Sequence, residues 1–270
     1  MSLRAVSYGG GVQSTALLVL AATGEIDFPL FLFSNVGDDS ERPATIEYVR
    51  TVAQPYAQQH GVELVELQKT MRDGRTMTLM QLLEQEATSV PIPMYLQSGA
   101  PGNRKCTGRF KIDVIAKELR HRGATKHNPA TVALGISLDE FHRARTSNGI
   151  DSQILTYPLI DLRLDRTACV TVIERAGLPV PPKSSCFFCP FNSKRAWLQL
   201  LREQPELFER SVRLEQMLND RRREMGKDEM YLTDTLRPLD QAITENGQLE
   251  MFGDPGDERS GCASAGYCMI

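Results

Sequence analysis

The sequence predicts an α/β protein with a doubly wound, mainly parallel sheet. Short apolar runs alternate with segments whose apolar residues recur at helical spacing, and the first run ends in three glycines. Strands that alternate with helices pair in parallel and are covered by helices on both faces. We expect this Rossmann-like domain at residues 1–180, followed by a helical, cysteine-bearing region at residues 181–270.

Five strands are expected where apolar runs have strand length, at residues 3–8, 28–34, 62–67, 131–136 and 152–156. Helices are expected between and after them, at residues 12–23, 41–59, 110–122, 166–176, 194–202 and 206–225. Gly24 closes the first helix, and Pro43 stands in the first turn of the second. Residues 69–105 contain many prolines and glycines, which predicts a loop-rich insertion or lid.

The composition is that of an ordinary globular protein, with 41% hydrophobic and 24% charged residues. A net charge of −3 argues against a generic polyanion binder. The sequence shows no apolar signal segment and no run near the roughly 18 apolar residues of a membrane span. We therefore expect a cytoplasmic protein without membrane contact. Its six cysteines are then thiols or metal ligands rather than disulfides.

A glycine-rich loop, Ser7–Thr15, joins the first strand to the first helix. Glycines let the backbone approach a phosphate, and the helix start offers N–H groups and a positive dipole end. The loop lacks the Lys-Ser/Thr of a Walker loop. It matches a dinucleotide fingerprint loosely, with a serine in the third glycine position and Asp38 or Asp39 as the ribose-binding acid. A tight turn without a ligand is the remaining alternative.

The loop resembles the PP-loop of the adenine nucleotide α-hydrolase superfamily, whose usual form is Ser-Gly-Gly-x-Asp-Ser. Gly9 stands in place of the first serine and Gln13 in place of the aspartate. The resemblance implies that the loop grips the β,γ-phosphates of ATP with Mg²⁺ and leaves the α-phosphate open to attack. The implied phosphate-binding residues are Ser7, Gly9, Gly10, Gly11, Gln13 and Ser14.

Further segments resemble, in order, the PAPS-reductase-like branch of that superfamily, over roughly residues 4–192. They are Asn35-Val36-Gly37 with Glu41-x-Pro43-x-Thr45, Cys106–Ile112, Gly135-Ile136-Ser137-x-x-Glu140 with Arg143 and Arg145, and Pro158–Asp161 leading to Cys186–Phe191. An arginine usually stands where this chain has Ser137. The resemblance implies nucleotide contacts by Asn35, Gly135 and Arg143 and a catalytic role for Arg145.

Cys186 and Cys189 form a C-x-x-C pair, which suits an iron–sulfur cluster, zinc or dithiol redox chemistry. Cys106 lies in a cationic stretch that favours the thiolate. The resemblance brings Cys106 to the pair as a catalytic thiolate and third metal ligand, most simply of a 4Fe-4S cluster. Cys262 or Cys268 would supply the fourth ligand or carry a persulfide. Structural Zn²⁺ and a plain redox pair stay open as alternatives, and Cys169 is expected in a helix core.

The resemblance implies an ATP-dependent sulfurtransferase that adenylates an acceptor with release of pyrophosphate. The acceptor could be a tRNA base, DNA or a small molecule, and a sulfur or electron donor protein is a further expected partner. Two other functions stay open. One is the reduction of PAPS or APS, and the other is a non-catalytic nucleotide-binding adaptor with a structural zinc site.

Overall fold

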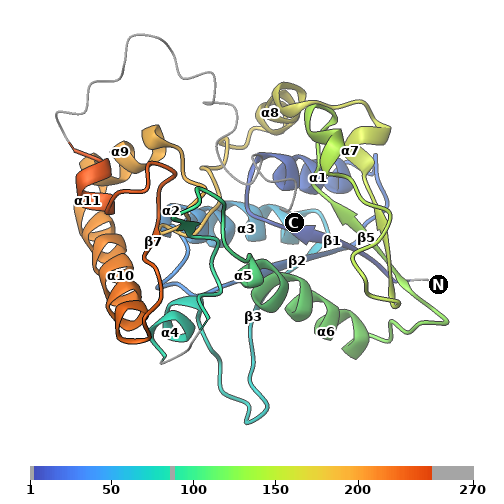
Figure 1. Ribbon diagram of the computed structural model, residues 1–270. Helices are drawn as coiled ribbons and strands as arrows, with labels where there is room; N and C mark the ends of the chain where they lie inside the picture. Colours follow the sequence, from blue (N-terminus) through green and yellow to red (C-terminus); the bar gives the residue numbers. More distant parts are fainter. Residues whose placement is uncertain (1–2, 86–88, 245–270) are drawn as a thin grey trace. The chain divides into compact units, whose positions relative to one another are not determined.

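The computed structural model describes residues 3–85 and 89–244 of the chain (Figure 1). Within this part the chain forms two compact units. The first consists of residues 3–78 and 107–184, and the second of residues 79–106 and 185–244. The second unit therefore combines residues 79–106, an insertion in the sequence of the first unit, with the segment that follows residue 184.

The first unit contains a five-stranded sheet in the order β3-β2-β1-β5-β6. Its strands are β1 (Arg4–Tyr8), β2 (Leu30–Asn35), β3 (Glu63–Gln68), β5 (Ala130–Leu134) and β6 (Gln153–Thr156). All four neighbouring pairs are parallel. The chain runs outward from β1 to β3 and then continues on the other side of β1, so the strand order reverses between β1 and β5. The predicted doubly wound α/β fold is confirmed.

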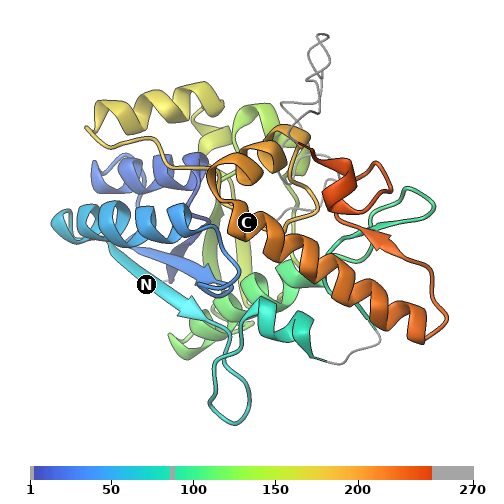
Figure 2. The same ribbon diagram turned by 90° about the vertical axis from the view of Figure 1, so that its left-hand side faces the viewer.

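Helices cover both faces of this sheet. Figure 2 shows α1, the helical segment of residues 43–59 and α8 together on one face, while α6 packs against β2 and β3 on the other. The helical elements are α1 (Val12–Ala22), α2 (Pro43–Tyr48), η1 (Val49–Ala53), α3 (Gln54–Gln59), η2 (Gly108–Ile112), α6 (Asp113–His121), η3 (Leu138–Arg143), α7 (Pro158–Asp161) and α8 (Arg166–Arg175). η1 and η2 are π-helical turns, and η3 is a 3₁₀ helix.

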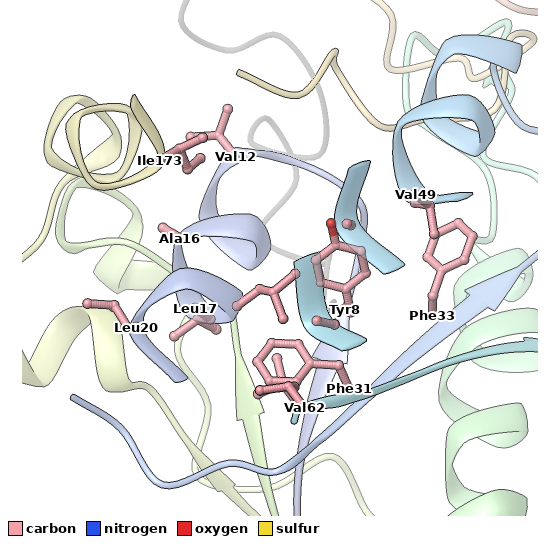
Figure 3. Close-up of a cluster of buried hydrophobic side chains, with 14 of the residues drawn as sticks. Tyr8, Val12, Ala16, Leu17, Leu20, Phe31, Phe33, Val49, Val62 and Ile173 are labelled. Carbon is pink, nitrogen blue, oxygen red and sulfur yellow. The ribbon is translucent and has the colours of Figure 1, made fainter. Parts of the chain in front are cut away.

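Two hydrophobic cores lie against the two faces. Tyr8, Phe31 and Phe33 belong to one cluster with Leu17 and Ile173, and Phe33 lies beside Val49 of η1 (Figure 3). The alternate strand residues belong to a second cluster on the α6 side. Both faces of β1 and β2 are thus buried, which explains why these strands read as nearly uninterrupted apolar runs.

The second unit is mainly helical. Its elements are α4 (Leu79–Glu84), β4 (Tyr95–Leu96), α5 (Lys105–Thr107), which extends across the boundary between the units, α9 (Lys194–Glu203), α10 (Pro205–Glu224), β7 (Met230–Tyr231) and α11 (Leu239–Ala242). β4 and β7 pair antiparallel. Arg221 of α10 donates hydrogen bonds to backbone carbonyls of the insertion at Leu83, Glu84 and Gln85. No helix in the described part of the chain is both long and apolar enough to cross a membrane.

Candidate nucleotide-binding site

The glycine loop connects β1 to α1 with its backbone in a shape that requires glycine. Gly10 has φ +74°, in the left-handed region, and a Cβ there would lie 3.1 Å from Cγ2 of Thr45. Gly11 is the N-cap of α1, and its N–H donates to Oγ of Ser14, which in turn donates to the carbonyl of Gly11. The hydroxyls of Thr15 and Tyr8 share a hydrogen bond of 3.0 Å. The hydroxyls of Ser14 and Thr15 are thus used to stabilise the loop. The groups that the loop offers to a ligand are the backbone N–H groups in the first turn of α1.

The loop lies at the point where the strand order reverses, between β1 and β5. Gly135, directly after β5, packs onto it: a Cβ at Gly135 would lie 3.0 Å from the backbone N of Ser14 and 3.3 Å from the carbonyl carbon of Gln13. In open α/β sheets, ligands bind beyond the carboxyl ends of the strands at such a reversal. The structure thus brings the predicted loop and the predicted Gly135 together at the expected edge.

Gln13 joins the loop to two other segments through its amide. Its Nε2 donates to Glu140 of η3 at 3.2 Å, and its Oε1 accepts from Nη1 of Arg166 at 3.2 Å. Glu140 also pairs with Arg143 at 2.5 Å. A carboxylate at position 13 would face Glu140 with like charge, whereas an amide can bind both neighbours. The departure from the aspartate of the PP-loop pattern therefore has a local electrostatic reason.

Two residues at the loop were missed by the sequence analysis. Arg166 begins α8, where a cation opposes the positive end of the helix dipole, and that unfavourable placement was the available signal. Ser184 donates a hydrogen bond to the carbonyl of Gly9, and its Cβ lies 3.7 Å from the position of a Cβ on Gly11. Ser184 follows a proline-rich stretch and gave no sequence signal.

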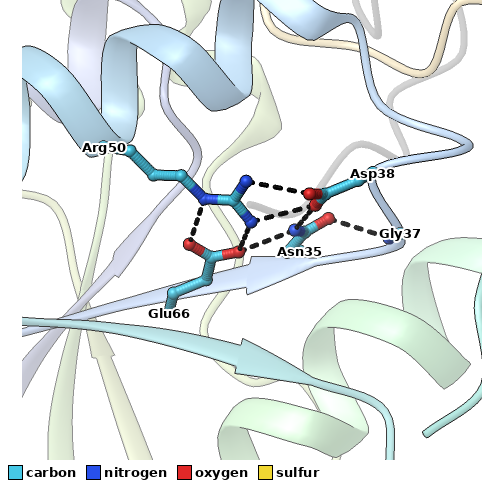
Figure 4. A network of polar contacts seen from close by, with 5 residues as sticks. All are labelled: Asn35, Gly37, Asp38, Arg50 and Glu66. Atoms are coloured by element: carbon cyan, nitrogen blue, oxygen red, sulfur yellow. Dashed lines mark hydrogen bonds and ion pairs between the residues drawn. The ribbon is translucent and has the colours of Figure 1, made fainter.

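Asn35 sits in a polar network at the end of β2 (Figure 4). Its Nδ2 donates to Asp38 and Glu66, and its Oδ1 accepts from the N–H of Gly37. Arg50 pairs with both acids at 2.7–2.8 Å and lowers the pKa of Asp38 and of Glu66. The side chains of Asn35 and Asp38 thus build the loop after β2.

Three buried side chains near the carboxyl edge have polar atoms without a hydrogen-bond partner in the described part of the chain. They are both carboxylate oxygens of Glu41 and the hydroxyls of Thr45 and Ser137. All three residues are at most 1% exposed. Burial raises the pKa of Glu41, while Lys111, with Nζ 3.9 Å from Oε1, acts in the opposite direction. Oxygen ligands of this kind fit Mg²⁺ beside a phosphate.

The other predicted residues also lie in the first unit. Ser7 lines a small cavity on the α6 side of the sheet together with Lys111, Leu134 and Gln153. Arg143 is buried beside Glu140, as described above. The backbone of Arg145 is held by Tyr157, whose hydroxyl accepts from its N–H and donates to its carbonyl.

The described cysteines other than Cys169 lie in the second unit. Cys186 and Cys189 share a turn closed by the N–H of Cys189 and the carbonyl of Cys186, and the N–H of Cys106 donates to the carbonyl of Pro91. The segment with Cys106 meets the segment with Cys189, because the guanidinium carbon of Arg104 lies 5.1 Å from the ring centroid of Phe191. Cys169, in the first unit, is fully buried, and burial raises its pKa to about 12, as expected for a core residue.

These cysteines do not complete a metal site among residues 3–85 and 89–244. No group of three or more His, Cys, Asp or Glu side chains there is arranged to hold a metal ion. Cys262 and Cys268, the predicted additional ligands, lie outside the described residues. The shared centre of Cys106, Cys186 and Cys189 stays a prediction.

Fold and site together define a doubly wound α/β protein with a glycine loop at its topological switch point. No family model matches the chain, and no curated protein matches it. Among solved structures, the chain is similar to U34-tRNA thiolase NcsA from Methanococcus maripaludis with its 4Fe-4S cluster. The identity is 16%, the match covers 80% of this chain and 72% of that chain, and the TM-score is 0.42.

Proposed function

We propose that this chain binds ATP at the Gly9–Gly11 loop and is an ATP-dependent sulfurtransferase of the PP-loop type. The observation that carries the proposal is the loop itself. It caps α1, requires glycine at position 10 and contacts the segment after β5 at the switch point. The lack of a Walker lysine argues against a Walker loop, and the resemblance to the PP-loop then favours that mode over the looser dinucleotide match.

In the proposed reaction, an oxygen of the acceptor attacks the α-phosphorus of ATP and pyrophosphate leaves. A sulfur nucleophile then attacks the acceptor carbon, the carbon–sulfur bond forms and AMP departs with the oxygen. The first-turn amides of α1 and the guanidinium of Arg166 would stabilise the charge that develops on the phosphates. The sulfur nucleophile would be the outer sulfur of a persulfide on Cys106, Cys186 or Cys189, loaded by a separate sulfur donor. Its attack leaves a disulfide between that cysteine and the acceptor sulfur. A second cysteine thiolate of the chain then attacks the protein sulfur of that disulfide, the thiolated acceptor leaves, and the protein disulfide formed in this way is reduced by an external dithiol. The acceptor would be a tRNA base, DNA or a small molecule.

ATP binding is tested by calorimetry with two glycine variants. Gly10→Ala places a Cβ against Thr45 at a left-handed φ, so the loop must shift, and ATP affinity should fall about tenfold or more, which is roughly 1.4 kcal/mol. Gly24→Ala is the matched control, because Gly24 has φ +78° at the other end of α1 but open space around its Cβ. Its affinity should stay near that of the wild type.

Two further results decide the proposal. Tight binding of NAD without binding of ATP would establish the dinucleotide alternative instead. Pyrophosphate release that depends on an added acceptor would support sulfur transfer, whereas ATP binding without any pyrophosphate release would favour a nucleotide-binding adaptor.

A further inference from the structure

Glu41 is a buried carboxylate without hydrogen-bond donors in the described residues. The residue is 1% exposed, and neither carboxylate oxygen has a hydrogen-bond partner there. Its ion pair with Lys111 spans 3.9 Å, longer than a hydrogen bond. A buried carboxylate is stable only when it is protonated, closely paired or bound to a cation. An ionised Glu41 therefore has no close compensation among the described residues beyond Lys111.

Thr45 presents a second incomplete polar atom close by in the sequence and next to the glycine loop. Its side chain is fully buried, and its hydroxyl has no partner within the described part of the chain. Its methyl group lies 3.1 Å from the position of a Cβ on Gly10. Glu41 and Thr45 flank Pro43 on the segment that leads into α2, and Thr45 joins this segment to the glycine loop.

The chemistry of these groups fits one kind of ligand. Mg²⁺ in nucleotide sites is held by one or two carboxylates, a hydroxyl and the phosphates, and a lysine commonly binds the same phosphates. Glu41, Thr45 and Lys111 supply a carboxylate, a hydroxyl and an ammonium group. The other two acids in the segment between β2 and α2 already have partners. Asp38 pairs with Arg50, and Asp39 accepts hydrogen bonds from the hydroxyls of Thr78 and Ser40.

We propose that Glu41 and Thr45 bind the Mg²⁺ that accompanies the nucleotide, with Lys111 bound to its phosphates. This inference rests on the proposed binding of ATP at the glycine loop. It assigns the metal to the segment before α2 rather than to position 13, where the PP-loop pattern has an aspartate and this chain has a neutral amide.

The test measures binding of a non-hydrolysable ATP analogue by calorimetry in EDTA and in Mg²⁺, together with Mn²⁺ binding followed by electron paramagnetic resonance. The wild type should bind the analogue more tightly with the metal. Glu41→Gln should lower Mn²⁺ affinity in the presence of the analogue at least about tenfold, as loss of a metal ligand does, and leave affinity in EDTA unchanged. Thr45→Val should act in the same direction, and Thr45→Ser, which keeps the hydroxyl, should restore binding.

Glu47→Gln is the matched control, because Glu47 is an exposed glutamate of the same helix, α2. The inference is overturned if Glu41→Gln keeps the full metal-dependent gain, or if it weakens binding equally in EDTA and in Mg²⁺. If Glu41→Gln does not fold, the two Thr45 variants decide. A wild type that binds the analogue without any gain from metal overturns this inference alone, whereas a wild type that never binds the analogue overturns the proposed function.

Discussion

Replacing Gly135 with alanine should disturb the contact between the loops after β1 and β5 without straining its own backbone. The new Cβ would lie 3.0 Å from the backbone N of Ser14 and 3.3 Å from its Cα. These are backbone atoms at the start of α1, and they cannot swing aside as the end of a long side chain can. Overpacking of this kind typically costs about 1–3 kcal/mol, so the free energy of unfolding should fall by that amount.

Urea unfolding and calorimetry of ATP binding test this prediction together. The shift of Ser14 should also weaken ATP binding, because the first-turn amides of α1 move with it. Gly108→Ala is the control: Gly108 lies in η2, nothing lies within 4 Å of its added Cβ, and alanine in a helix should stabilise by up to about 1 kcal/mol. If Gly135→Ala unfolds at the wild-type urea concentration and binds ATP normally, the reasoning that joins the two loops is wrong.

Three other predictions concern separate parts of the molecule. Burial raises the pKa of Glu215 to about 7, against an unfolded value near 4.5, so the folded state binds more protons between these two pH values. The free energy of unfolding should therefore fall, by at most about 3 kcal/mol, as the pH rises from 4.5 to 7. Unfolding measured as a function of pH should show this slope, and Glu215→Gln should lack it. Arg166→Ala should weaken ATP binding about tenfold in calorimetry, because the guanidinium of Arg166 lies at the glycine loop. Arg175→Ala, at the other end of α8, should leave ATP affinity unchanged. Equal effects of the two substitutions would refute a local role for Arg166. Iron measured after anaerobic purification should persist in Cys169→Ser and be lost from the serine variants of Cys106, Cys186 and Cys189. Zinc without iron in the wild type would exclude the cluster.

The sheet could be predicted because its signal is local. Each strand of the first unit lies within two residues of its predicted bounds at both ends, since a run of apolar residues bounded by glycine or polar residues marks a buried strand. The helices α1, α8, α9 and α10 also begin within one residue of the prediction. The short pairing of β4 with β7 was not predicted, because two-residue strands from distant segments leave no periodic pattern.

The helix expected at residues 41–59 shows how one residue changes a regular element. The structure has α2, the π-helical turn η1 and α3 in its place. Pro55 stands in the first turn of α3, where it has no N–H to donate and its ring would collide with the carbonyl of Thr51 in a regular α-helix. The wider turn at Val49–Ala53 relieves that collision. Sequence periodicity predicts the helix but not this local widening.

The candidate site could be predicted only as far as its backbone. Three glycines after a strand predicted the loop, and Gly135 was expected to belong to it. The partners of Gln13 could not be found, because Glu140 and Arg166 lie 127 and 153 positions away in sequence and meet it only in the folded sheet. The burial of Glu41 was equally hidden, since a glutamate two positions before a proline ordinarily predicts an exposed helix start.

The composition of the second unit has a consequence for how the chain folds during synthesis. The sheet of the first unit is complete once β6 has left the ribosome, and α8 follows soon after. The insertion that carries β4 is made before that point, but its partners, β7 and Arg221 of α10, are made long afterwards. Because protein synthesis proceeds at about 5–20 residues per second, the backbone of β4 has no partner strand for several seconds. Truncation after residue 184 would remove β7 and α10 altogether. A first unit isolated by this single cut would therefore still contain the insertion, but without its partners.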